Sequence, residues 1–148
     1  YRVNRQGKFN VPFGRYKNPK ILDEENLLAV HEALQIADIF VSDFEEAVKS
    51  AKSKDFIYFD PPYQPLSKTS NFTSYTKNAF SKIEQIRLSK VFKKLHNQGC
   101  YVLLSNSYTS FIKMLYSEFT IITVYARRAI NSKADGRKPI AEVLIKNY

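Results

Sequence analysis

The chain is poor in residue types whose scarcity excludes whole classes of site. Of its 148 residues, one is Cys, four are Gly and none is Trp. A single Cys, Cys100, permits neither an intramolecular disulfide nor a cysteine-rich zinc site. It lies between Gly99 and the apolar run Tyr101–Leu104, so we expect a buried structural thiol. The glycines stand apart from one another, and no G-x-G sequence occurs anywhere.

Membrane segments and metal sites are not expected either. No apolar run approaches the ~18 residues of a membrane helix, and no signal peptide opens the chain, which predicts an intracellular, cytoplasmic location. His31 and His96 fall in predicted helices without a carboxylate or Cys at metal-ligand spacing. Structural or surface roles are therefore favoured for both, and no metal is implied.

What the chain does have is positive charge and aromatic rings. Its length suits one domain, and 44% hydrophobic residues is ordinary for a packed core. The net charge is +9, with 10 Tyr and 11 Phe. A basic domain rich in stacking residues favours an anionic partner, and nucleic acid over a membrane. Composition alone leaves open that the chain binds no acidic partner.

Helical and strand patterns alternate along the chain. Asp23 and the capping box of Ser81 with Glu84 each predict the start of a helix. Two loops are expected, over 64–78 and 131–138. The expected strands are 39–41, 56–59, 101–104, 120–125 and 141–145, and the other expected helices start at Asp43, running to about Ala51, and span 109–116. This order predicts an α/β fold whose sheet is mostly parallel and ends in an antiparallel strand pair.

The most informative motif is Asp60-Pro61-Pro62-Tyr63, directly after the apolar run Phe56–Phe59. Ligands of open α/β sheets bind at the carboxyl ends of the strands. There, the Asp60 carboxylate and the Pro61 carbonyl could accept hydrogen bonds from an exocyclic amine while Tyr63 stacks on its ring. Two acceptors on one amine aim its lone pair at a methyl donor. The alternative is a strand that ends in a turn stiffened by proline.

Three stretches of the chain resemble the DNA adenine N6-methyltransferases of the Dam type, which act on GATC. They are residues 9–17 (FNVPFGRYK), residues 58–66 (YFDPPYQPL) continuing to 71–75 (NFTSY), and residues 104–107 (LSNS). The resemblance implies a Rossmann-like S-adenosylmethionine-dependent methyltransferase fold. Residues 1–22 would belong to the DNA target-recognition segment and residues 23–148 to the catalytic domain. Because relatives carry a Phe-x-Gly-x-Gly loop upstream, the chain is expected to be the C-terminal portion of such an enzyme.

The resemblance also implies a cofactor site and a pocket. Asp43 and Phe44 match residues that contact the adenine part of S-adenosylmethionine, and Asp60 would join them. From the residues alone, Asp43 could equally be a simple helix N-cap, and the two roles are compatible. Ser105 and Asn106 end a predicted parallel strand, so they are expected to shape the pocket near Asp60.

DNA contacts are expected from three segments. By resemblance, Arg2 reads a guanine, Pro12 touches a thymine methyl, and Arg15 and Tyr16 hold the outer base pair and the backbone. Asn4 and Asn10 are expected to brace this segment or to bind phosphate. The remaining candidates are Phe72 and Tyr75, which could close over a flipped base or anchor their loop, and Arg127 and Lys138, in a basic cluster that contacts phosphates or is ordinary solvated surface.

The sequence thus predicts methyl transfer from S-adenosylmethionine to N6 of a flipped adenine in double-stranded DNA, within GATC. The missing N-terminal half of the enzyme is a candidate partner. One alternative is an inactive fragment that serves as a DNA-binding module or as half of a split enzyme. Another is methylation of a different exocyclic amine, on cytosine N4 or on an RNA adenine.

Overall fold

The computed structural model describes residues 4, 6–9, 17–66, 80–126 and 139–148 of the chain. These residues form two compact units, 1–41 and 42–148, and each is described by itself. The sequence predicts a functional boundary after residue 22, between a DNA-recognition segment and a catalytic domain. The boundary between the two compact units lies after residue 41 and does not test it, so the functional boundary stays a prediction.

The first unit contains one helix, α1 (Glu24–Leu34), among its described residues. As predicted, Asp23 caps it: the carboxylate accepts a hydrogen bond from the N–H of Asn26 at 3.4 Å. Glu24 and Glu25 follow in the first turn, where acids favour the positive end of the helix dipole.

The predicted strand at residues 39–41 is wrong. Within the described residues, these positions form no strand, and all four strands of the sheet come from residues 56–146. A strand needs a neighbour to pair with its backbone groups, and an apolar run of three residues does not reveal whether such a neighbour exists.

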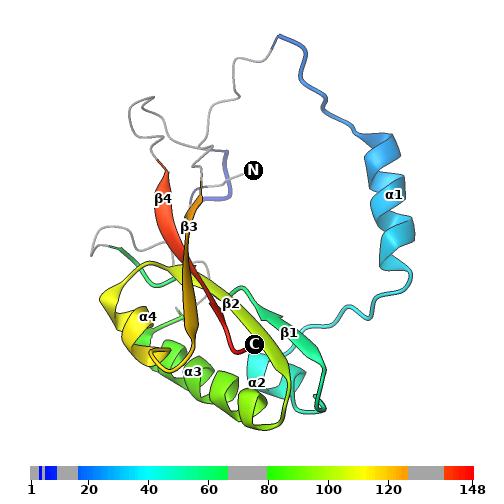
Figure 1. Ribbon diagram of the computed structural model, residues 1–148. Helices are drawn as coiled ribbons and strands as arrows, with labels where there is room; N and C mark the ends of the chain where they lie inside the picture. The colour runs from blue at the N-terminus through cyan, green and yellow to red at the C-terminus, as the bar shows by residue number, and fades with distance from the viewer. Residues whose placement is uncertain (1–3, 5, 10–16, 67–79, 127–138) are drawn as a thin grey trace. The chain divides into compact units, whose positions relative to one another are not determined.

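The second unit is built on a four-stranded sheet in the order β1-β2-β4-β3 (Figure 1). The strands are β1 (Phe56–Phe59), β2 (Tyr101–Ser107), β3 (Thr120–Ala126) and β4 (Ile140–Lys146). β1 and β2 pair in parallel, whereas β4 runs antiparallel to both of its neighbours, β2 and β3.

This topology confirms the final antiparallel pair and corrects the mostly parallel sheet. β3 runs in the same direction as β1 and β2, but it pairs with β4, which lies between β2 and β3. Only one of the three pairings is therefore parallel. Alternation of predicted helices and strands indicates direction, but not which strands become neighbours. The result is a mixed α/β fold that is compatible with a methyltransferase.

Among the described residues, three helices accompany the sheet: α2 (Phe44–Ala47), α3 (Lys82–Asn97) and α4 (Ser110–Leu115). α2 is shorter than predicted, because residues 48–51 form tight i→i−3 turns instead of continuing the helix. Ser81 caps α3 through the N–H of Ile83. Glu84, the other half of the predicted capping box, binds Arg87.

The core lies between α3 and one face of the sheet. Four apolar side chains of α3, at the spacing of one helix face, pack against alternate residues of β2 and β4. The buried set includes Leu88, Val91, Phe92 and Leu95 from α3, Val102 and Leu104 from β2, and Val143 and Ile145 from β4. None of the described helices is long and apolar enough to cross a membrane.

Candidate active site

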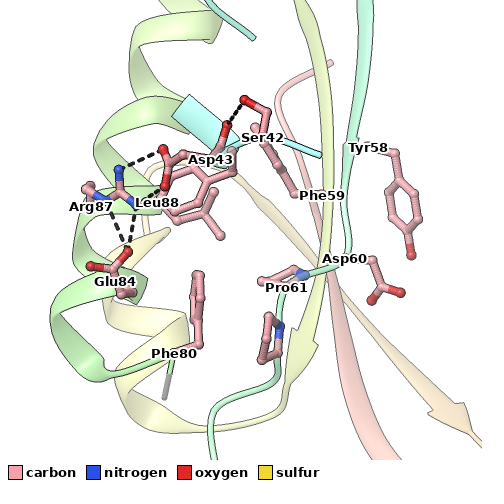
Figure 2. Close-up of a pocket in the computed structure, with 12 residues that line it drawn as sticks. Ser42, Asp43, Tyr58, Phe59, Asp60, Pro61, Phe80, Glu84, Arg87 and Leu88 are labelled. Atoms are coloured by element: carbon pink, nitrogen blue, oxygen red, sulfur yellow. Dashed lines mark hydrogen bonds and ion pairs between the residues drawn. The ribbon is translucent and has the colours of Figure 1, made fainter. Parts of the chain in front are cut away.

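A cavity of about 380 Å³ opens where β1 ends and where α2 and α3 pack together (Figure 2). Its walls are partly apolar and partly charged. They bring together five of the residues predicted for catalysis or cofactor binding: Asp43, Phe44, Asp60, Pro61 and Pro62. Tyr58, Phe59, Phe80, Glu84, Arg87 and Leu88 also line the cavity. Asp43 and Asp60 thus line the same cavity, although the strand expected before Asp43 is absent from the described residues.

Asp60 is exposed at the carboxyl end of β1, and one of its oxygens is held in place. The hydroxyl of Ser105, on β2, donates a hydrogen bond to Oδ1 of Asp60 at 2.8 Å. That hydroxyl in turn accepts a hydrogen bond from the Tyr58 hydroxyl at 3.0 Å. Because β1 and β2 are parallel neighbours, Tyr58 and Ser105 reach the same edge of the sheet. Among the described residues, only Oδ1 of Asp60 has a hydrogen-bond partner, so Oδ2 can accept a hydrogen bond from a ligand.

Two amide side chains anchor the turn that follows Asp60. Gln85, on α3, donates a hydrogen bond from Nε2 to the carbonyl of Pro62 at 2.9 Å. Asn106, on β2, accepts one from the N–H of Gln64 at 3.0 Å and donates one to Oε1 of Gln85 at 3.1 Å. Both amides are fully buried. Ser105 and Asn106 thus contact Asp60 and the turn after it, but neither lines the cavity, and their role in shaping it stays a prediction.

Gln85 was missed from the sequence, although a signal for it exists. It lies three residues before Leu88 and seven before Phe92, so it falls on the apolar face of α3. A polar residue on a buried helix face must find hydrogen-bond partners. That requirement marks Gln85 as a side chain with a specific partner in the core.

Tyr63 takes a different position from the rest of the motif. Its side chain is half-buried and does not line the cavity. Burial raises the pKa of its hydroxyl, an effect that the nearby Ser105 hydroxyl opposes. Stacking of Tyr63 on a substrate ring stays a prediction.

Asp43 caps α2 and forms an ion pair with Arg87. Its Oδ1 accepts a hydrogen bond from the N–H of Glu45 at 3.0 Å. The guanidinium of Arg87 binds both carboxylate oxygens, at 2.9 and 2.6 Å. These contacts, the Arg87 hydrogen bond first, lower the pKa of Asp43. Asp43 is therefore the N-cap of α2. Its carboxylate, predicted as a polar acceptor for the cofactor, already binds Arg87.

Arg87 joins the charged wall of the cavity to its aromatic wall. It binds Glu84 at 2.8 Å as well as Asp43, and these carboxylates raise its own pKa (Figure 2). Its guanidinium lies over the ring of Phe44, 4.0 Å from the centroid. Phe80 packs near the same ring, with centroids 6.0 Å apart. The Phe44 ring thus contacts both a cation and a second aromatic side chain.

Most residues predicted to contact DNA lie outside the described residues: Arg2, Asn10, Pro12, Arg15, Tyr16, Phe72, Tyr75, Arg127 and Lys138. Asn4 is described. Its Oδ1 accepts hydrogen bonds from the N–H groups of Gln6, at 2.9 Å, and Lys8, at 3.1 Å. Asn4 therefore closes a local turn, in line with the bracing alternative, and a phosphate contact stays a prediction. No cluster of three metal-ligating side chains occurs among the described residues.

The fold and the site define an α/β protein with a carboxylate-bearing cavity at the carboxyl edge of its parallel strands. Comparison with known sequences then places it. Residues 1–130 match the model of the D12 class N6 adenine-specific DNA methyltransferase. The chain belongs to this family.

Curated relatives match nearly the whole chain. A type II methyltransferase of Methanocaldococcus jannaschii, M.MjaIII, is 53% identical over 150 residues, which cover 100% of this chain and 52% of the relative. The DNA adenine methylase of Vibrio cholerae is 39% identical, covering 97% of this chain and 52% of the relative. The DNA adenine methylase of Escherichia coli is 36% identical, covering 97% and 51%. The chain thus spans about half the length of the curated relatives it matches.

Proposed function

We propose that this chain supplies the amine-binding part of the active site of a DNA adenine N6-methyltransferase. The observation that carries the proposal is the position of Asp60: a carboxylate with one oxygen fixed by Ser105 and the other available, beside a proline turn on the wall of a cavity. Family membership and relatives named DNA adenine methylase support the same reaction.

The chemistry follows from two acceptors that face one amine. Oδ2 of Asp60 and the carbonyl of Pro61 accept the two hydrogens of the adenine N6 group, which draws its lone pair out of conjugation with the ring. The nitrogen attacks a methyl group, and its extra proton leaves once the amine is cationic. Asp60 orients the amine and need not be a strong base. The adenine must first leave the duplex, at a cost of a few kcal/mol.

The cavity suits the methyl donor that the family implies, S-adenosylmethionine. When bound, this cofactor supplies an electrophilic methyl group on sulfur, and transfer to N6 leaves a neutral thioether. Phe44, Phe80 and Leu88 offer apolar surface for a purine, while Asp43 and Arg87 form a polar edge. A volume of about 380 Å³ is in the range of small-molecule sites. We propose a Rossmann-like methyltransferase fold on this basis.

The substrate we propose is double-stranded DNA that contains GATC, in a cytoplasmic setting. The support is the resemblance of residues 9–17 to Dam-type enzymes and a net charge of +9, which suits a polyanion. Arg2, Pro12, Arg15 and Tyr16 would read and hold the site. We also propose that an N-terminal half of the enzyme completes the cofactor pocket.

The test measures transfer of labelled methyl groups from S-adenosylmethionine to duplexes. The chain and the complete product of its gene are assayed side by side on a GATC duplex and on one with GTTC. Nucleoside mass spectrometry then identifies the product. N6-methyladenine formed on GATC alone supports the proposal, whereas N4-methylcytosine or a preference for RNA supports the other amine substrates.

Asp60→Ala and Asp60→Asn connect the activity to the proposed site. Both should abolish transfer and leave DNA binding largely intact, because Asp60 binds the amine and not the phosphates. Wild-type turnover in Asp60→Ala would remove Asp60 from the mechanism. DNA binding by the complete product without any methyl transfer would favour the binding-module alternative.

A further inference from the structure

Two fully buried amide side chains, Gln85 and Asn106, meet where α3, β2 and the D-P-P-Y turn come together. Their neighbours in the core are apolar side chains such as Leu88 and Leu104. A buried amide is unfavourable unless its donors and acceptors are paired. An apolar side chain would fill the same volume without that requirement, so the pair indicates a need that packing alone does not meet.

A hydrogen bond joins the two amides: Nδ2 of Asn106 donates to Oε1 of Gln85 at 3.1 Å. Gln85 Nε2 binds the carbonyl of Pro62, and Asn106 Oδ1 accepts from the N–H groups of Gln64 and Ser107, the latter at 2.8 Å. Together they link a helix, a strand and a segment without regular secondary structure.

The two backbone anchors lie on either side of Tyr63. Residues 60–65 form no helix or strand, so no ladder of backbone hydrogen bonds holds them. The Pro62 carbonyl and the Gln64 N–H are bound instead by side chains that are themselves fully buried. The anchors therefore fix the turn directly after Asp60 and Pro61, the two residues that present acceptors to the amine.

We propose that Gln85 and Asn106 are positioning residues for methyl transfer. They act through the turn, holding the Asp60 carboxylate and the Pro61 carbonyl at a set distance from the substrate amine. The inference rests on the proposed function and assigns to it two residues outside the D-P-P-Y motif. Because a displacement of ~1 Å can cost ~10²-fold in rate, loosening the turn should slow the reaction itself.

The experiment uses Gln85→Met and Asn106→Leu in the complete gene product. Both variants keep the approximate volume of the side chain and remove its hydrogen bond with the turn. The control is Leu95→Ala, which removes a buried side chain about 15 Å further along the same helix than Gln85.

Three quantities are measured for each variant: the single-turnover rate of methyl transfer, the Kd for DNA and for S-adenosylmethionine, and the melting temperature. We expect Gln85→Met to lower the rate by about 10²-fold and to change each Kd by less than about threefold, within about 1 kcal/mol. Leu95→Ala should lower the melting temperature at least as much as the Gln85 variant does. At temperatures below its own melting temperature, it should keep the wild-type rate.

The outcomes separate this inference from the proposed function. Wild-type rates in Gln85→Met and Asn106→Leu would overturn the positioning role and leave the proposed function standing. An equal loss of rate in the control Leu95→Ala would overturn it as well. A wild-type protein that transfers no methyl group would overturn the proposed function and, with it, the inference.

Discussion

The hydroxyl of Ser105 holds one oxygen of Asp60 through a hydrogen bond of 2.8 Å, although the two residues are 45 positions apart in the chain. The contact exists because β1 and β2 are parallel neighbours whose carboxyl ends meet at one edge of the sheet. Since Tyr58 donates to the same hydroxyl, the lone pairs and the proton of Ser105 have defined directions. The carboxylate can therefore present a single oxygen to the substrate.

Ser105→Ala should slow methyl transfer by about tenfold to hundredfold. A hydrogen bond to a charged group contributes about 1.5–3 kcal/mol, and about 1.4 kcal/mol corresponds to tenfold in rate. The effect should appear in kcat and not in DNA affinity, because the bond orients Asp60. The measurement is the single-turnover rate beside a DNA titration. The control is Ser89→Ala, which removes a hydroxyl that binds a carbonyl within α3 and should change neither the rate nor the DNA affinity. Equal losses of rate in the two variants would contradict the role of Ser105.

Tyr116→Phe should stabilise the fold by about 1 kcal/mol. Tyr116 is fully buried against the ring of Phe92, at 5.3 Å between centroids, and its hydroxyl has no partner among the described residues. An unsatisfied buried polar group costs about 1–3 kcal/mol, and burial raises the pKa of this hydroxyl. Urea unfolding measures the change. Tyr101→Phe, at an exposed site, is the control, and a destabilised Tyr116→Phe would mean that the hydroxyl is paired.

The parts of the fold that follow from the sequence are those set by neighbouring residues. The caps Asp23, Ser81 and Thr109 each bind the backbone two or three residues on, so their effect is visible in a short window. β1 and the D-P-P-Y motif after it are likewise recognisable from one short stretch of sequence. The predictions of a strand at 39–41 and of a longer α2 were wrong. A short apolar run does not determine whether a segment pairs with another strand, or where a helix ends.

The parts that could not be predicted depend on contacts between distant positions. β4 lies between β2 and β3, an arrangement that no local pattern encodes. Arg87 binds Asp43 across 44 positions and changes a free acceptor into one side of an ion pair. Gln85 could be marked as unusual on an apolar helix face, but its partners, Pro62 and Asn106, only follow from the packing of α3 on β2.

Gly99→Ala should destabilise the connection between α3 and β2. Gly99 has φ +79°, and an added Cβ would lie 2.7 Å from Oγ of Ser53. The left-handed conformation costs a residue with a side chain about 1–2 kcal/mol, and the contact adds to this. Gly7 has φ +75° with nothing within 4 Å of its added Cβ, so Gly7→Ala measures the conformational cost alone.

The two glycine variants are compared by urea unfolding. Gly99→Ala should lose more free energy of unfolding than Gly7→Ala, and adding Ser53→Ala should recover part of the difference, since the nearest remaining atom would be Cβ of Ser53 at 3.4 Å. Equal losses in both glycine variants, with no recovery, would show that Ser53 moves aside freely.

Arg87→Met should weaken binding of S-adenosylmethionine by about tenfold, which corresponds to about 1.4 kcal/mol. The guanidinium holds Asp43 through two hydrogen bonds and covers the ring of Phe44, so its loss frees both cavity residues. Arg87→Lys should fall between the two, because an ammonium keeps the charge but not the planar fork. Calorimetry with the complete gene product measures the Kd, and the exposed Lys90 on the same helix gives the control, Lys90→Met.

The same pair predicts a pH dependence. Arg87 lowers the pKa of Asp43 below its ordinary value of 3.8. The contribution of the pair is therefore fully present above pH 3.8 and is lost as the pH falls through the lowered pKa of Asp43 in the folded protein. In Arg87→Met the pKa of Asp43 should rise towards its ordinary value, which NMR titration of the carboxylate can follow. An unchanged pKa together with an unchanged Kd would show that Arg87 is a surface charge without influence on the cavity.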